Sequence, residues 1–102
     1  MSKIAMIGDR DSIWPFKAFG VSLYLLKSMD ETKEALKRAL SQDHAIIFVT
    51  EEVFKACREE IYEVQDRPTP AITILPSLRG SQGLGMEEIK EAVRKAIGAE
   101  IL

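Results

Sequence analysis

Two carboxylates, Asp9 and Asp11, follow directly after a short apolar run at residues 4–7. In an open parallel sheet, ligands bind just beyond the carboxyl ends of the strands. An acidic pair at such a position can hold a magnesium ion through its carboxylate oxygens, as in phospho-receiver domains. A receiver domain also needs a phosphoryl-accepting aspartate after its third strand, whereas here the third apolar run is followed by Glu51 and Glu52. The spacing therefore argues against phosphotransfer, and the two glutamates suit the first turn of a helix.

Two further residues could act as a nucleophile or a base, but neither has the neighbours that catalysis requires. Cys57 is the only cysteine and stands four residues from both Val53 and Ile61, the spacing of one apolar helix face. We therefore expect a buried structural thiol, and a lone cysteine excludes an intrachain disulfide. His44 is the only histidine, with no serine or cysteine partner nearby in the sequence. The sequence thus predicts no catalytic residue, no cofactor and no metal ion.

A glycine-rich segment precedes the last predicted helix, since residues 80–85 read Gly-Ser-Gln-Gly-Leu-Gly. Backbone N–H groups in such a segment can cradle an anion. The spacing matches neither the dinucleotide fingerprint nor a Walker loop, and the segment follows the last predicted strand rather than the first. A hinge or a close approach of two backbones is the favoured interpretation.

The composition is that of one small globular domain. The chain has 102 residues, 46% of them apolar and 29% charged, with a formal net charge of −2. This balance argues against a general nucleic-acid coat and against intrinsic disorder. The first apolar run is too short for a signal peptide, and no window approaches the 18 apolar residues of a membrane span. We expect any link to a membrane to come through partners.

Four apolar runs alternate with four helical patterns along the chain. We expect strands at residues 4–7, 21–26, 44–49 and 71–75, and helices over about 12–19, 28–42, 50–64 and 86–97. This order predicts an α/β fold, a small doubly wound four-stranded parallel sheet of Rossmann-like or receiver-like type with a C-terminal helix. The predicted single domain, 1–102, consists of an α/β core at 1–76, a glycine-rich loop at 77–85, and a helix and tail at 86–102.

The predicted element ends carry local signals. Pro15 lacks a backbone N–H and belongs in the first turn of its helix, which should therefore begin no earlier than about Ser12. Ser28 and Glu31 have the form of a capping box, and Thr50 is placed to cap the third helix. We expect that helix to be continuous and to bury one apolar stripe, which comprises Val53, Phe54, Cys57, Ile61 and Val64.

Trp14 and Phe16 are the aromatic residues whose role the sequence leaves open. A short helix needs anchors in the core, and two aromatic rings can supply them. The same pair could instead form an apolar contact patch on the surface.

Five segments resemble the F subunit of V-type and A-type ATPases. Near the start these are residues 7–12, Ile-Gly-Asp-Arg-Asp-Ser, and residues 15–20, Pro-Phe-Lys-Ala-Phe-Gly. Residues 47–52, Ile-Phe-Val-Thr-Glu-Glu, resemble the third strand and following helix start of that family. The strongest likeness is in residues 80–86, Gly-Ser-Gln-Gly-Leu-Gly-Met, and residues 95–102, Lys-Ala-Ile-Gly-Ala-Glu-Ile-Leu. The likeness covers the full length, with Trp14-Pro15 as a local departure.

The resemblance implies a non-catalytic rotor subunit of the central stalk. Such a protein binds the coiled-coil shaft, which is the D subunit of the same complex, and helps couple ATP hydrolysis or synthesis to H⁺ or Na⁺ transport. It would lie in the cytoplasm, peripheral to the membrane through the ATPase complex. The alternative is a stand-alone receiver-like or small-ligand regulatory domain, against which the missing acceptor aspartate argues.

In that setting the last helix and the tail are expected to carry much of the contact with the shaft. Their apolar stripe continues to the chain end, and the glycine-rich loop would let the helix lift toward a partner. Arg94 and Lys95 beside this stripe could meet acidic residues of the shaft. The expected contact residues are Ile89, Val93, Arg94, Ile97, Ile101 and Leu102, with Trp14 and Phe16 as the competing patch.

Overall fold

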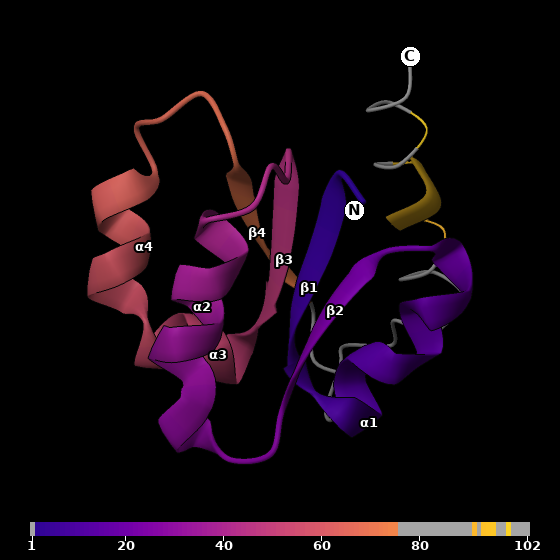
Figure 1. The fold of residues 1–102 in the computed structure, drawn as a ribbon, viewed down its shortest axis with the longest axis horizontal. Helices are drawn as coiled ribbons and strands as arrows, with labels where there is room; N and C mark the ends of the chain where they lie inside the picture. The colour runs from indigo at the N-terminus through magenta and orange to yellow at the C-terminus, as the bar shows by residue number, and fades with distance from the viewer. Residues whose placement is uncertain (1, 76–90, 92, 96–97, 99–102) are drawn as a thin grey trace.

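Four parallel strands form a single sheet in the order β2-β1-β3-β4 (Figure 1). The computed structural model describes residues 2–75, 91, 93–95 and 98 of the chain. The strands are β1 (Ile4–Asp9), β2 (Ser22–Leu26), β3 (Ile46–Thr50) and β4 (Ala71–Leu75). The strands β1 and β3 are central, and β2 and β4 are the edges. Because all three strand pairs are parallel, the predicted α/β fold with its parallel sheet is confirmed.

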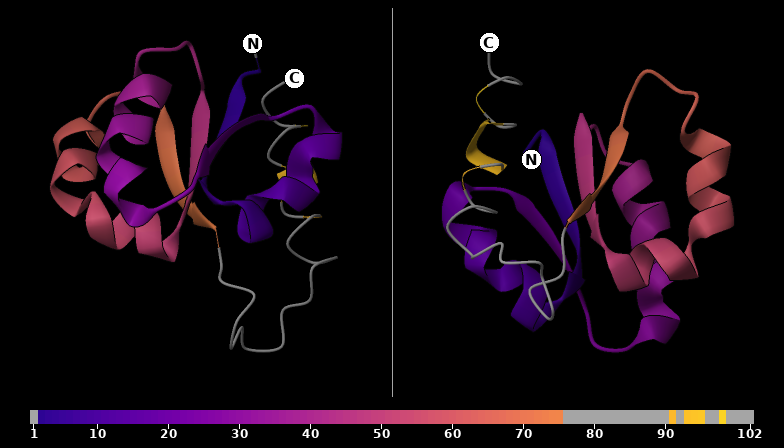
Figure 2. Two further views of the ribbon diagram at one scale, coloured as in Figure 1. Left: turned by 60° about the horizontal axis from the view of Figure 1, so that its bottom comes forward. Right: turned by 180° about the vertical axis from the view of Figure 1, so that it is seen from behind.

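Helices cover both faces of the sheet (Figure 2). One face carries α2 (Thr32–Leu40), α3 (Glu51–Ala56) and α4 (Arg58–Val64), with the short 3₁₀ helix η2 (Met29–Glu31) leading into α2. The other face carries α1 (Arg10–Ile13) and the 3₁₀ helix η1 (Trp14–Phe19). The described helical residues of the C-terminal segment lie on this second face, as Val93 packs into its core.

Two hydrophobic cores lie on the two faces because successive side chains of a strand point in opposite directions. Around α2, α3 and α4 the buried residues are Ala5, Ile7, Leu26, Ala35, Leu36, Ala39, Ile47, Val49, Val53, Cys57 and Ile61. Beneath α1 and η1 they are Ile4, Met6, Ile13, Phe16, Val21, Phe48, Leu75 and Val93.

The first helix begins earlier than its proline suggested. It begins at Arg10 rather than Ser12, because Asp9 caps it by accepting a hydrogen bond from the Ser12 backbone N–H. Pro15 has no N–H to continue an α-helical ladder, and the chain changes to 3₁₀ geometry at Trp14. Gly20 then ends the segment with φ 75°, a left-handed conformation that favours glycine.

The third predicted helix is divided in two, which corrects the expectation of one continuous helix. The break lies at Cys57, whose φ of −117° and ψ of 23° are not helical. No glycine or proline stands there, so the sequence carries no local signal for it. The apolar stripe survives the break, since Val53, Cys57, Ile61 and Val64 are all buried; only Phe54 is half-buried. The break therefore leaves the buried face of the two helices intact.

Most other predicted boundaries agree within about two residues. The β4 strand has the predicted bounds, whereas β1 extends two residues further, to Asp9, and α2 ends at Leu40. Glu31 reaches back to the Ser28 N–H, and the Val53 N–H donates to Thr50 Oγ1 at 3.3 Å, which confirms both predicted caps. The expected glycine-rich loop at 77–85 lies outside the described residues.

Candidate functional site

The carboxyl ends of β1 and β3 are closed by close packing. A Cβ atom at Gly8 would lie 2.5 Å from Thr50 Cγ2 and 3.1 Å from Ile13 Cγ2. Glycine is therefore required at this position, and the Thr50 methyl group fills the space beside it. This is where ligands bind in many doubly wound sheets, and here it is occupied by side chains of the chain itself.

Asp9 uses its carboxylate to cap the end of a helix. Its oxygens accept hydrogen bonds from the Ser12 backbone N–H at 3.2 Å and from Ser12 Oγ at 2.8 Å. Asp11, the other member of the predicted acidic pair, is exposed in the first turn of α1. Within residues 2–75 and the described part of the C-terminal segment, no three His, Cys, Asp or Glu side chains cluster in a way that could hold a metal ion.

His44 is buried and belongs to a partly buried hydrogen-bonded chain. Its side chain is 3% exposed, with Nδ1 2.7 Å from the Ser2 carbonyl oxygen and Nε2 2.8 Å from the Tyr24 hydroxyl. A carbonyl oxygen only accepts, so Nδ1 donates to Ser2 and, in the neutral ring, Nε2 accepts from Tyr24. Burial raises the pKa of the Tyr24 hydroxyl, which keeps it protonated as the donor. The arrangement ties the chain start, β2 and the entry to β3 together.

The burial predicted for Cys57 is confirmed. The residue is fully buried in the core under α3 and α4. Desolvation raises the pKa of the Cys57 thiol, and the nearby Glu60 raises it further. A protonated thiol in an apolar core is a poor nucleophile.

The two aromatic residues near the chain start have different environments. Phe16 is 1% exposed and packs in the core, with its ring 5.9 Å from Phe19 in a T-shaped arrangement. Trp14 is 38% exposed, and its ring is contacted by Arg10 at 4.2 Å and Lys17 at 4.9 Å. Of the two alternatives, the core applies to Phe16 and the surface to Trp14. Phe16 is therefore corrected from a candidate contact to an anchor, because its ring is covered.

The described part of the C-terminal helix shows one buried and one exposed candidate. Val93 is 1% exposed and packs in the same core as Phe16. Arg94 is exposed: its Nη1 is 2.7 Å from Glu91 Oε2, and its guanidinium lies 5.3 Å from the Phe19 ring. A partner contact by Val93 would require the helix to leave this position. The other four predicted contacts, Ile89, Ile97, Ile101 and Leu102, lie outside the described residues.

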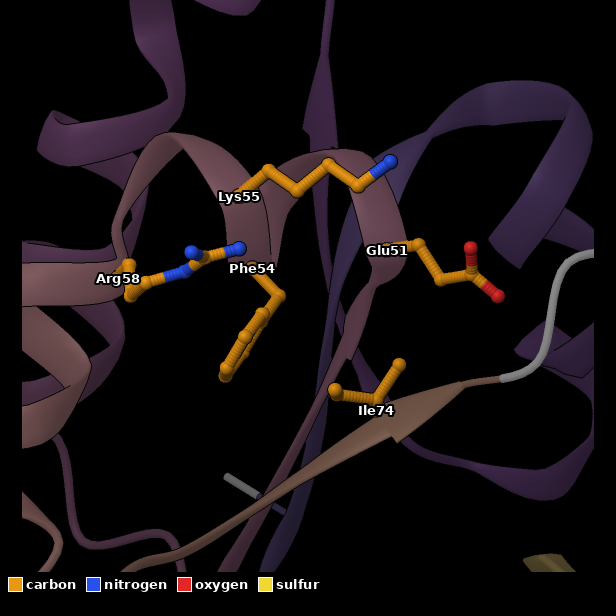
Figure 3. A pocket seen from close by; sticks show the side chains of 5 residues that line it. All are labelled: Glu51, Phe54, Lys55, Arg58 and Ile74. Carbon is orange, nitrogen blue, oxygen red and sulfur yellow. The ribbon is translucent and has the colours of Figure 1, made fainter.

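A shallow hollow of about 240 Å³ lies between α3 and the edge strand β4 (Figure 3). Its lining is mostly apolar, and Ile74 on β4 is 42% exposed there. The five lining residues are Glu51, Phe54, Lys55, Arg58 and Ile74. Sequence reasoning missed this feature, because the run at 71–75 does not reveal that β4 is an edge strand.

The chain is similar over nearly its whole length to components of ATP synthases. The family described as "ATP synthase (F/14-kDa) subunit" matches residues 4–93. The F subunit of the V-type ATP synthase of Fusobacterium nucleatum is 37% identical over 102 residues, covering 100% of this chain and 97% of that protein. The F subunit of the V-type ATP synthase of Clostridium botulinum (strain Eklund 17B) is 35% identical over 100 residues, covering 98% of this chain and 97% of that protein.

A more distant relative is archaeal. The F subunit of the A-type ATP synthase of Methanothermobacter thermautotrophicus is 29% identical over 103 residues, covering 99% of this chain and 97% of that protein. The same full-length likeness to bacterial V-type and archaeal A-type proteins confirms the resemblance drawn from the sequence motifs. The chain therefore belongs to the family of the F (14-kDa) subunit of ATP synthases.

Proposed function

We propose that this chain is a non-catalytic central-stalk subunit of a rotary V-type or A-type ATPase. In this role it binds the coiled-coil shaft, the D subunit, and helps couple ATP hydrolysis or synthesis to H⁺ or Na⁺ transport. The observation that carries the proposal is the match, over nearly the full length of both chains, to the F subunits of V-type and A-type ATP synthases.

The placement of the reactive side chains supports a non-catalytic role. Asp9 caps α1, His44 is bonded to Ser2 and Tyr24, and the Cys57 thiol is buried with a raised pKa. Each of these groups is thus engaged in holding the fold rather than placed to act on a substrate. ATP turnover in this proposal belongs to other subunits of the complex.

The proposed shaft contact lies along the C-terminal helix and tail. Arg94 is exposed there and already meets a carboxylate, that of Glu91, at 2.7 Å. An acidic residue of the shaft could compete for the same guanidinium and so set the register of the two partners. Trp14 offers an exposed aromatic ring in η1, and η1 lies on the same face of the sheet as Val93.

The proposed location is the cytoplasmic side of the membrane, where the chain is held by the complex. No helix among the described residues is both long and apolar enough to cross a bilayer. Membrane association in this proposal therefore runs through partner subunits.

Co-purification of the full chain with the shaft protein of the same organism tests the proposal. We expect a stable pair, and we expect Arg94→Glu to weaken it about tenfold by reversing one interfacial charge. Lys37→Glu is the matched control, because Lys37 is exposed on α2 on the opposite face of the sheet. Absence of any complex between the wild-type chain and the shaft protein would overturn the proposed function.

A further inference from the structure

The hollow between α3 and β4 is a part of the sheet face that the helices leave uncovered. Ile72 and Ile74 point to the same face, but Ile72 packs against the core, whereas Ile74 is 42% exposed. Figure 3 shows Ile74 and Phe54 facing one another across the hollow. The β4 strand, Ala-Ile-Thr-Ile-Leu, carries neither the charge nor the proline that usually protects an edge strand. This surface therefore has the character of one that is covered by another element.

The Phe54 side chain, which lines the hollow, is held in place by two neighbouring side chains. The Phe54 ring lies 6.4 Å from the Tyr62 ring in a T-shaped arrangement. The Arg58 guanidinium lies 5.7 Å from the centre of the Phe54 ring. Tyr62 is itself 52% exposed. An aromatic ring fixed in this way offers a preorganised apolar surface, which lowers the entropic cost of binding.

Charges around the hollow define what a partner must carry. Arg58 stands at one end of the hollow, whereas the Lys55 side chain extends from α3 toward the other end (Figure 3). Neither cation forms an ion pair with any residue that the structure describes. Glu51 stands at the other end, with its carboxylate directed away from Phe54 (Figure 3). A carboxylate on the partner would be attracted at the Arg58 end and repelled at the Glu51 end.

The hollow and the proposed shaft contact lie on opposite sides of the molecule. Arg94 lies on the α1 face of the sheet, whereas α3 and α4 cover the other face (Figures 1 and 2). A helix that lies against Arg94 would not reach Ile74 around the edge of the sheet. The hollow therefore calls for a second docked segment.

We infer that the hollow between α3 and β4 docks an amphipathic helix of a second partner protein. A large apolar side chain of that helix enters the space between Phe54 and Ile74. A carboxylate on the same helix pairs with Arg58. A helix suits this place because helices are what cover the remainder of the same sheet face. The chain would then bridge two partners within the complex, an arrangement that rests on the proposed function.

Photo-crosslinking within the purified ATPase complex tests which segment contacts the hollow. The probe is a benzoyl-phenylalanine residue in place of Ile74. We expect it to join this chain to a helical segment of another subunit that carries both an apolar residue and a carboxylate. A crosslink found only within this chain, or no crosslink in a complex that retains the chain, would overturn the inference. Loss of the unmodified chain from the complex would instead overturn the proposed function.

Charge and polarity changes provide a second, independent measurement. We expect Ile74→Asp and Arg58→Glu each to weaken rebinding of the chain to a complex depleted of it by about tenfold. Met29→Asp and Lys37→Glu are the matched controls, because Met29 is 48% exposed and Lys37 is exposed on α2. Circular dichroism of each variant establishes that it is folded. Unchanged rebinding by both hollow variants would overturn the inference, even if binding to the shaft is intact.

Discussion

At the scale of single residues, the contact between Gly8 and Thr50 shows how tightly the ends of the strands are packed. Thr50 has two tasks, since its Oγ1 caps α3 and its methyl group fills the space over Gly8. A side chain at position 8 would therefore disturb both the strand ends and the start of a helix.

We predict that Gly8→Ala lowers the free energy of unfolding by about 2 kcal/mol, because the new methyl group overpacks the site. Thr50→Ser removes the opposing methyl group while keeping the capping hydroxyl. The double variant should therefore be less destabilised than the sum of the single changes by about 1 kcal/mol. Urea unfolding of the four proteins measures this coupling, and strict additivity would contradict the contact.

Cys57 provides a second prediction at this scale. We expect Cys57→Ala to cost about 1 kcal/mol of stability, since little volume is lost from the core. The raised pKa of the thiol keeps it protonated at neutral pH, and burial shields it. Labelling by a maleimide should thus be slow in the native chain and fast in urea. Fast labelling of the native chain would show that the thiol is accessible.

At the scale of elements, the start of α2 is held by one carboxylate. Glu31 Oε1 accepts hydrogen bonds from the Lys27 N–H at 2.6 Å and the Ser28 N–H at 3.2 Å. These bonds, that from Lys27 foremost, lower the pKa of Glu31 below its ordinary value of 4.5. The bonds favour the ionised form, so the folded chain holds its proton less tightly than the unfolded chain does.

We predict that Glu31→Gln destabilises the chain at neutral pH and that this difference disappears in acid. The contribution of a carboxylate with a lowered folded pKa is complete above the unfolded value, 4.5. It is lost as the pH falls through the lower folded value. Urea unfolding of both proteins across this range measures the difference. A difference that persisted at the lowest pH would show that the charge is not its source.

Element ends were predictable where local chemistry sets them. The two prolines flanking residues 71–75 marked β4, and Ser28, Glu31, Thr50 and Gly20 marked helix ends. The break at Cys57 was not predictable, because no glycine or proline stands there to mark it.

Features that join distant parts of the chain were also beyond sequence reasoning. Tyr24 and His44 stand twenty residues apart, so their hydrogen bond follows no local pattern. The hollow beside Ile74 exists because β4 is an edge strand, and strand order is a tertiary property. Burial is likewise a tertiary property: the sequence left the roles of Trp14 and Phe16 open, and the fold exposes Trp14 and buries Phe16.

At the scale of the whole molecule, the C-terminal helix contributes to the core as well as to the proposed shaft contact. Val93 completes the cluster that also contains Phe16 and Leu75. We predict that ending the chain at Gly85 leaves a folded but less stable remnant, because this core loses a buried valine. Its affinity for the shaft protein should fall at least about 100-fold. Calorimetric titration measures this, and undiminished binding would place the contact elsewhere.

The proposed non-catalytic role leads to a further prediction for the isolated chain. We expect no binding of ATP with magnesium, because the space beside Gly8 at the strand ends is filled by Thr50. Calorimetry should show only heat of dilution. A dissociation constant of about 10 μM or tighter, near −7 kcal/mol, would contradict this expectation.

The strand order has a mechanical consequence. The N-terminal strand β1 lies between β2 and β3, so it has parallel neighbours on both sides. A force that pulls on β1 along its length loads the hydrogen bonds to β2 and to β3 at the same time, in shear, rather than one after another. By contrast β4 has a ladder on one side only. A chain built in this way resists tension best at β1, which would suit the stalk role proposed for it.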